Sequence, residues 1–319
     1  MKRMKMSKKE DITLKEGIEK FIRHCKIKDL AKSSIDYYER SCEYFLTFVE
    51  DELNKDDNLE IYYINKDMIE NYILWLDDTY NMNNISLNTR LRGIRAFIYY
   101  MMEQDYLEEF KIDLLKEEKK IKETYTDSEL KKLLKKPDLD ECSFAVYRNW
   151  VIINFLLATG VRSRTLINLK IKDIRLDEAI VHIKTVKNRK QQIIPLSKSL
   201  TEVLSEYLNY RKGDEDDYLF CSIYGNKFTG SSLNGAIRTY NINRGVTKTS
   251  VHLFRHTFAK KWILNGGDSF RLQKILGHST MRMVREYVNM FSNDLKKDFN
   301  DYNPLEQFKV NKKHIKMKK

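Results

Sequence analysis

The sequence predicts a mainly α-helical protein with one small β-sheet, divided into two domains. Three observations support this prediction. Glycine and proline are scarce, at 11 and 3 of 319 residues, while helix-forming and aromatic residues are common. Apolar residues recur at helical spacing over long stretches, and clear alternation occurs only between residues 169 and 197. The length also fits two domains.

The first domain, residues 1–110, is predicted to be a bundle of four amphipathic helices. Each helix has an apolar stripe, such as Leu87, Leu91 and Ile94 in the last one, and such helices bury their stripes against one another. A serine before the second helix is expected to cap it. The helices are expected over Ile12–Cys25, from Ser33 or Ser34 onward, over Lys66–Asp78 and over Ser86–Gln104.

A charged, poorly patterned segment is predicted to separate the two domains. This linker covers residues 111–122. The second domain, residues 123–306, begins with Thr126-Asp127-Ser128-Glu129, which has the pattern of a capping box ahead of an apolar run. A basic tail, residues 307–319, is expected to follow it.

Within the second domain, the sequence predicts one buried helix and one β-hairpin. The run Trp150–Ala158 is apolar but too short for a membrane span, so it is expected to be a buried helix. Ala179–Ile183 and Gln192–Leu196 are expected to be paired strands. Lys187-Asn188-Arg189-Lys190 forms a basic turn between them.

The charge balance indicates an anionic partner. The formal net charge is +12 and the isoelectric point is about 9.2. Nucleic acid is the first candidate and an anionic membrane surface the second, although a lysine-rich protein with no anionic partner is also compatible. The four cysteines lie far apart in the sequence, which predicts free thiols in a reducing cytosol: Cys25, Cys42, Cys142 and Cys221.

Two basic residues lie at positions suited to phosphate. Thr159-Gly160 predicts a helix end with a left-handed cap, and Arg162 then begins the next helix. A helix N-terminus attracts anions, and arginine binds phosphate with two donors. Lys187 in the hairpin turn could reach a phosphate or donate a proton. Each pattern alone also fits an ordinary cap or turn with a solvated side chain.

Three histidines and a tyrosine follow. His252 and Arg255 are three residues apart on a predicted helix and therefore share a face. His252 and His256 have a zinc-like spacing, but the metalloprotease glutamate and an acidic third ligand are missing, so no metal site is predicted. Leu276-Gly277-His278 predicts another helix break, and Tyr287 follows nine residues after His278. A lone tyrosine usually belongs to a core or an interface.

Taken together, these residues suit phosphoryl transfer without a metal. The transition state spreads negative charge over the non-bridging oxygens. Two guanidinium groups and an imidazole can stabilise that charge from fixed positions. A tyrosine hydroxyl can attack phosphorus and form a covalent phosphotyrosine.

The order and spacing resemble the tyrosine recombinase family, which includes phage integrases and Xer-type recombinases. That family has an arginine after Thr-Gly, a hairpin lysine before an Ile-Pro-Leu-like strand, His-x-x-Arg-His, Leu-Gly-His and a tyrosine nine residues on. All five elements occur here in that order, in a second domain that the resemblance covers fully. The four helices before it are similar in pattern to the family's core-binding domain.

The resemblance implies a role for each group. Tyr287 attacks the scissile phosphate and forms a 3′-phosphotyrosyl link, while Arg162, Arg255 and His278 stabilise the phosphorane. It also implies that neither ATP nor a metal or other cofactor is needed, because the phosphotyrosine conserves the bond energy.

Proton transfer is divided among the remaining residues. The resemblance implies that Lys187 protonates the leaving 5′ oxygen. His252 acts as a general base or hydrogen-bond partner, and His256 supports the site by packing.

The resemblance further implies a homotetramer on paired double-stranded DNA sites, acting in the cytoplasm in the service of a mobile element or the chromosome. A C-terminal segment within residues 123–306 is expected to dock onto the neighbouring protomer. The candidate DNA-binding residues are basic side chains of the fourth helix and the hairpin: Arg90, Arg92, Arg95 and Arg189. The alternative is a solvated basic face.

One residue departs from the family pattern. Thr165 stands where the family usually has an acid, three places after the first arginine; Asp173 is a possible substitute. This departure leaves room for a catalytically weakened DNA-binding regulator. A type IB topoisomerase or telomere resolvase with the same tyrosine chemistry is the other alternative.

Overall fold

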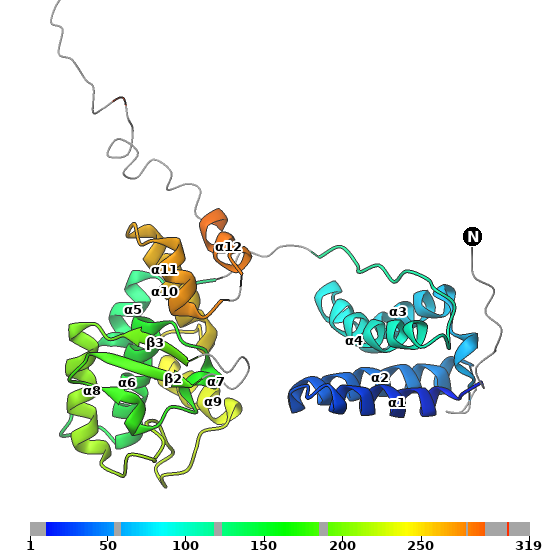
Figure 1. The fold of residues 1–319 in the computed structure, drawn as a ribbon. Helices are drawn as coiled ribbons and strands as arrows, with labels where there is room; N and C mark the ends of the chain where they lie inside the picture. Colours follow the sequence, from blue (N-terminus) through cyan, green and yellow to red (C-terminus); the bar gives the residue numbers. More distant parts are fainter. Residues whose placement is uncertain are drawn as a thin grey trace, which may run out of the picture. The chain divides into compact units, whose positions relative to one another are not determined.

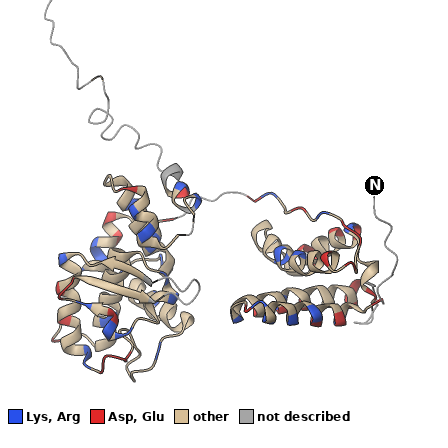
Figure 2. Cartoon of the chain, viewed as in Figure 1, with Lys and Arg blue, Asp and Glu red and all other residues tan. Residues whose placement is uncertain are grey.

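A computed structural model describes residues 11–53, 59–117, 123–184, 191–278 and 280–290, together with Leu305. The chain divides into two compact units, residues 1–120 and 121–319, which Figure 1 shows as ribbons. Basic and acidic residues are interspersed along both units (Figure 2). The mainly helical architecture with one small sheet confirms the predicted fold class.

The first unit contains the four predicted helices. Thr13 and Glu16 form a capping box at the start of the first helix, and Asn65 and Asn83 cap the third and fourth. Aromatic rings fill the space between the helices. The helices are α1 (Leu14–Ile27), α2 (Lys32–Leu53), α3 (Lys66–Tyr80) and α4 (Asn84–Glu103), with a short 3₁₀ helix, η1 (Ile61–Tyr63).

The predicted cap of α2 is wrong. Ser33 and Ser34 lie inside the first turn of the helix, which begins at Lys32. The backbone N–H groups of Ser34 and Ile35 donate to the carbonyl of Ala31, at 2.7 and 3.2 Å. The carbonyl of Ala31 therefore starts the helical hydrogen-bond ladder, and this role requires no capping side chain.

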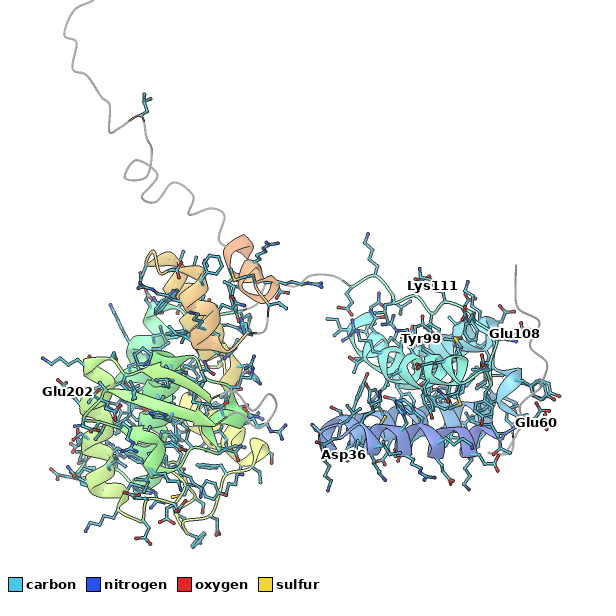
Figure 3. The ribbon with its side chains drawn as sticks, in the orientation of Figure 1. Asp36, Glu60, Tyr99, Glu108, Lys111 and Glu202 are labelled. Atoms are coloured by element: carbon cyan, nitrogen blue, oxygen red, sulfur yellow. The ribbon has the colours of Figure 1, made fainter. Side chains whose placement is uncertain are left out.

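The chain after α4 continues along the first unit. Leu107 and Ile112 are buried in its core. The N–H of Ile112 donates to the hydroxyl of Tyr99, which Figure 3 labels. Asn88 exchanges two hydrogen bonds with the backbone of Leu115, both of 2.8 Å. The described part of the predicted 111–122 linker thus packs on α4; the rest lies outside the described residues.

The second unit is an α+β domain around the buried helix α6. Its sheet is antiparallel in the order β1-β2-β3, with Ile180 opposite Pro195 and Ile183 opposite Gln192. The predicted hairpin strands are confirmed, whereas the two-residue β1 was missed. The elements are α5 (Asp127–Leu134), α6 (Phe144–Thr159), α7 (Ser163–Leu166), η2 (Ile171–Asp173), β1 (Ile174–Arg175), β2 (Ile180–Lys184), β3 (Gln191–Pro195), α8 (Lys198–Arg211), α9 (Gly230–Asn243), α10 (Val251–Leu264), α11 (Ser269–Leu276) and α12 (Arg282–Met290).

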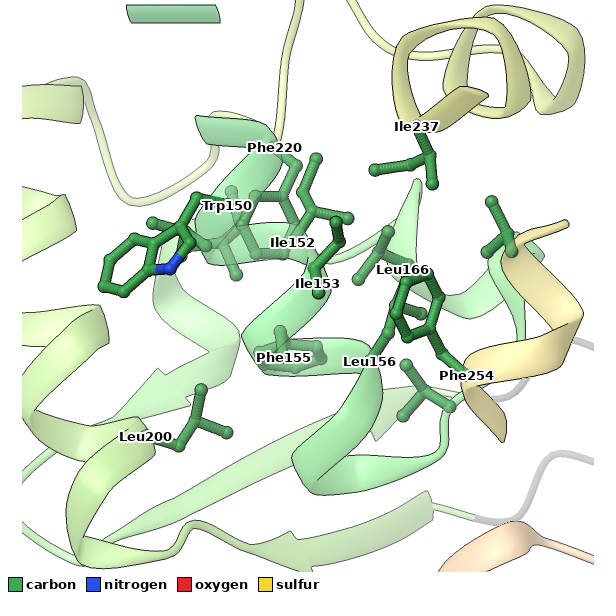
Figure 4. Close-up of a cluster of buried hydrophobic side chains, with 14 of the residues drawn as sticks. Trp150, Ile152, Ile153, Phe155, Leu156, Leu166, Leu200, Phe220, Ile237 and Phe254 are labelled. Atoms are coloured by element: carbon green, nitrogen blue, oxygen red, sulfur yellow. The ribbon is translucent and has the colours of Figure 1, made fainter. Parts of the chain in front are cut away.

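Helix α6 lies in the middle of the second core. Trp150, Ile153 and Phe155 are all buried, together with Phe220 and Phe254 from other elements (Figure 4). A helix that is apolar on every side must be surrounded by protein, as predicted for this run. The predicted capping box of Thr126 and Glu129 is also present at α5.

The structure also describes the four cysteines. The four cysteines are free thiols, as predicted. Among the residues that the structure describes, we find no helix with both the length and the apolar character that a membrane span requires. Within the same residues, no cluster of three potential metal-binding side chains occurs.

Candidate active site

Arg162 lies just after the C-terminal end of α6, beyond a tight turn. Gly160 ends the helix in the left-handed region, with φ of 61°, as the sequence predicts. A Cβ atom there would also lie 2.5 Å from Cδ1 of Phe258, so the position requires glycine on two grounds. Two residues later, Arg162 is the N-cap residue of α7, and its side chain is exposed.

Arg255 on α10 is buried and holds three groups together. Its Nη1 donates to the carbonyl of Gly160 at 2.7 Å, and its Nη2 donates to that of Leu276 at 2.8 Å. Nη2 also lies 2.7 Å from Nε2 of His278. Burial lowers the pKa of Arg255 to about 10; the charge of Arg162 acts in the same direction and Tyr287 in the opposite one. The guanidinium is therefore cationic at neutral pH.

The C-terminal end of α11 is where these donors meet. Gly277 caps the helix with φ of 60°, and His278 follows directly. The carbonyl of Gly277 accepts from both terminal nitrogens of Arg162, each at 3.4 Å. From β3, the amide of Gln192 donates to two more α11 carbonyls, both at 2.6 Å. Cationic and amide donors suit the negative end of a helix dipole.

Tyr287 on α12 faces the second unit rather than solvent. Its side chain is only 3% exposed, and it packs with Leu272, Leu276 and Val284. Its hydroxyl lies 2.8 Å from Nδ1 of His256. Seclusion and a direct histidine contact distinguish this tyrosine from a solvated surface residue.

The histidine that contacts the tyrosine is His256, for which the family resemblance implies only a packing role. His252 is exposed on α10, whereas His256, one helical turn further, contacts the hydroxyl of Tyr287. The spacing of four placed both histidines on one face of the helix. Which of them meets a tyrosine 31 residues away depends on how α12 packs, and no local pattern in the sequence specifies that packing.

Two candidate site residues fall outside the described residues: Lys187 and Arg189, in the turn between β2 and β3. The departure at Thr165 lies on α7, where its N–H donates to the carbonyl of Arg162. The possible substitute, Asp173, accepts the backbone N–H of Lys170 at 2.9 Å and so caps η2. Its carboxylate is engaged in that local cap.

The three candidate DNA-binding arginines of α4 do not share one environment. Arg92 forms a 2.7 Å ion pair with Glu117, and Arg95 reaches the carbonyl of Ile112 at 3.5 Å. Arg90 instead lies 4.2 Å above the ring of Tyr44 on α2. Two of the arginines therefore face the 107–117 segment and one faces a neighbouring helix.

Within the second unit, the described site consists of two guanidinium groups, an imidazole and a tyrosine hydroxyl bonded to a second imidazole. The guanidinium groups and His278 meet at the end of α11 and offer several N–H donors. Such a set suits a phosphate whose charge increases in the transition state. Tyr287 supplies a tyrosine hydroxyl in direct contact with His256, the neighbour of Arg255 on α10.

Comparisons with known proteins agree with this geometry. Residues 123–293 match the phage integrase family, and residues 13–123 match the phage integrase SAM-like domain. A tyrosine recombinase XerD of Staphylococcus epidermidis is 26% identical over 297 residues, which cover 90% of this chain and 98% of the relative. The XerD of Staphylococcus haemolyticus has the same identity and coverage.

Solved structures share the fold. The integrase of the Tn1549 transposon, in complex with a circular intermediate DNA, superposes with a TM-score of 0.69 at 20% identity, covering 86% of this chain and 95% of that one. The XerH site-specific recombinase bound to its difH substrate gives a TM-score of 0.63 at 23% identity, covering 85% and 81%.

Proposed function

The chain belongs to the phage integrase family of tyrosine recombinases, and we propose that it cuts and rejoins double-stranded DNA at specific sites with Tyr287 as the nucleophile. The observation that supports this most is the burial of Arg255 and its contact with His278, together with the seclusion of Tyr287 in the same unit. Burying a cation costs desolvation free energy. Stabilisation of a negatively charged transition state would explain why Arg255 is buried here.

The proposed cleavage step is a transesterification. Tyr287 Oη forms a bond to phosphorus as the bond to the 5′ oxygen breaks, leaving a 3′-phosphotyrosyl link. Arg162, Arg255 and His278 bind the non-bridging oxygens, and Lys187 gives its proton to the leaving 5′ oxygen. A 5′ hydroxyl from the partner strand reverses the step and exchanges the strands. The residues of this chain supply all of these groups, so no cofactor is included.

The partner and setting extend this proposal. The solved neighbours include complexes with DNA, and the charge of +12 favours an anionic ligand. We assign Arg90, Arg92, Arg95 and Arg189 to the DNA contact. We further propose a homotetramer on paired sites, acting in the cytoplasm. The relatives include both a transposon integrase and Xer recombinases, so a mobile element is one setting among two.

The recombinase is favoured over the alternatives. The matched relatives are tyrosine recombinases named XerD, and the match covers 98% of the Staphylococcus epidermidis protein. A DNA-binding regulator would bind without a covalent adduct, and a type IB topoisomerase would relax DNA without exchanging strands.

The test begins by recovering the DNA that the protein binds in cells. A nicked duplex of that sequence then traps the covalent adduct, because the short cleaved strand is lost. We expect an SDS-stable adduct in excess EDTA, and none with Tyr287→Phe, which keeps the ring but lacks the oxygen. Binding without an adduct would favour the regulator. Cleavage that EDTA abolishes and magnesium restores would indicate a metal-dependent nuclease.

A further inference from the structure

A tyrosine nucleophile must lose its proton as it attacks phosphorus, and the described part of the chain offers a direct recipient. His256 Nδ1 lies 2.8 Å from Tyr287 Oη, and the two ring centroids are 5.7 Å apart with planes inclined by 47°. The rings are tilted rather than stacked, and the distance between nitrogen and oxygen is that of a hydrogen bond. This geometry links the two reactive atoms and not just two packed rings.

The elements on both sides hold this pair in place. His256 is partly buried on α10, next to Arg255, whose guanidinium is fixed by the carbonyls of Gly160 and Leu276. On α12, the ring of Tyr287 is 3% exposed. Side chains that packing already confines lose little further conformational freedom when they form a hydrogen bond. The pair is therefore preorganised before any DNA is bound.

One neighbouring group, Arg255, interacts favourably with a negative charge on the phenolic oxygen. The pKa of Arg255 is lowered by burial and by Arg162, but Tyr287 raises it. That interaction operates between the positive guanidinium and a negative phenolate, so Arg255 stabilises the phenolate in return. A proton that leaves Tyr287 toward His256 thus leaves behind a charge with a buried cation nearby.

His252 is less suited to this task. Its side chain is exposed at the N-terminal end of α10, one turn away from the residue that contacts the hydroxyl. This position leaves His252 accessible to a phosphate group. Of its two expected roles, it therefore suits that of hydrogen-bond partner better than that of general base.

We propose that His256 orients the hydroxyl of Tyr287 and accepts its proton during attack. The Oη–H bond breaks and an Nδ1–H bond forms, while Oη bonds to phosphorus and the 5′ oxygen leaves with a proton from Lys187. In rejoining, the imidazolium of His256 returns the proton to Oη. This inference rests on the proposed function and adds a catalytic residue on the nucleophile side of the reaction.

Two substitutions separate orientation from proton transfer. His256→Asn places an amide oxygen close to the position of Nδ1, so it keeps an acceptor for the hydroxyl but is a poor base. His256→Ala removes both. We expect single-turnover cleavage of the nicked substrate to fall by about 10²-fold or more in His256→Ala, in the range of general base catalysis, and by less in His256→Asn. Added imidazole should restore part of the rate to His256→Ala.

A sulfur-substituted substrate identifies the side of the reaction. With a 5′-bridging phosphorothiolate, the leaving sulfur needs no proton. We expect this substrate to rescue Lys187→Ala but not His256→Ala. His182→Ala, on β2, is the matched histidine control and should cleave like the unaltered protein. Gel shifts and thermal unfolding, measured on each variant, separate catalytic loss from unfolding.

Three outcomes are decisive. Wild-type rates in His256→Ala would overturn the inference, and so would rescue of His256→Ala by the sulfur substrate, which would assign the residue to the leaving group. Cleavage by His256→Asn at the rate of the unaltered protein would also overturn proton transfer, because asparagine keeps the hydrogen-bond acceptor but is a poor base. If the unaltered protein forms no adduct, the proposed function fails instead, so the two failures are distinguishable.

Discussion

Arg255 Nη2 lies 2.7 Å from Nε2 of His278, so one candidate catalytic residue is the hydrogen-bond donor of another. Because a guanidinium can only donate, Nε2 must accept, and the proton of a neutral His278 ring is then on Nδ1. In this arrangement Nε2 is occupied by the guanidinium. For His278 to donate to a phosphate oxygen from Nε2, this bond must be exchanged for one to the substrate.

The first prediction concerns the forked shape of Arg255. Arg255→Lys keeps the charge, but one ammonium group cannot satisfy the carbonyls of Gly160 and Leu276 as well as His278. We expect single-turnover cleavage to fall by about 10²–10³-fold, as for loss of one transition-state donor. Arg244→Lys is the matched control, because Arg244 also donates to two backbone carbonyls, those of Lys132 and Lys135. Equal losses in both variants would contradict a specific role.

The second prediction concerns the cap of α11. A Cβ at Gly277 would lie 2.9 Å from Oε1 of Gln192, whose amide nitrogen is held by two carbonyls. Gly277→Ala should therefore destabilise the protein by more than the ~1–2 kcal/mol of a left-handed alanine.

A double-mutant cycle tests that contact. Adding Gln192→Ala should remove the clash, so we expect the two free energies of unfolding to be non-additive by about 0.5–3 kcal/mol, the range for residues in contact. Urea unfolding of the four proteins measures this. Strict additivity would mean that Gln192 moves away freely and does not fix the turn before His278.

The third prediction concerns Thr165. Because it replaces an acid of the family pattern, we expect Thr165→Glu to cleave at least as fast as the unaltered protein, if the carboxylate orients Arg162 or a histidine. Arg162→Ala, by contrast, should lose about 10²–10³-fold. Single-turnover cleavage measures both. Loss of cleavage in a folded Thr165→Glu protein would show that the site is built around threonine.

The fourth prediction concerns salt and Arg92. If Arg92 binds a phosphate, Arg92→Ala should weaken DNA binding uniformly across sequences and reduce the log–log salt slope by about 1. Glu117→Gln should strengthen binding, because Glu117 pairs with Arg92 at 2.7 Å. Fluorescence anisotropy over a range of salt concentrations measures the slope. An unchanged slope in Arg92→Ala would show that Arg92 does not bind a phosphate and only pairs with Glu117 in the 107–117 segment.

The fifth prediction concerns pH and Asp216. Hydrogen bonds from Lys170 and Lys172 lower the pKa of Asp216 to about 2. A carboxyl with a lowered pKa stabilises the fold above its unfolded value, and this contribution is lost as the pH falls from about 4 to about 2. Asp216→Asn should therefore be less stable than the unaltered protein at pH 7 and equally stable near pH 2.

Because Asp216 is exposed, this difference should be small and should decrease with salt. Chemical denaturation at pH 7, 4 and 2 measures it, with Asp177→Asn as an exposed control. A difference that persists at pH 2 would show that the asparagine acts through something other than lost charge.

The sequence by itself determined the local features of this protein. Gly160 ends its helix in the predicted left-handed conformation, Gly277 ends its helix at the predicted break, and Thr126 caps α5 as expected. These features depend on residues within about four positions of each other, where backbone sterics and capping act. The order of the five motifs was likewise readable along the chain, and it indicated the family without any tertiary structure.

Only the tertiary structure decided which of these residues meet. His256 contacts a tyrosine 31 residues away, and Arg255 reaches a histidine 23 residues away. Gln192 on β3 donates a hydrogen bond to a carbonyl of α11, more than 80 residues further along the chain. The sequence placed His252 and His256 on one face of a helix but could not choose between them. That choice follows from how α10, α11 and α12 pack, since close packing fixes long-range contacts that helical periodicity leaves open.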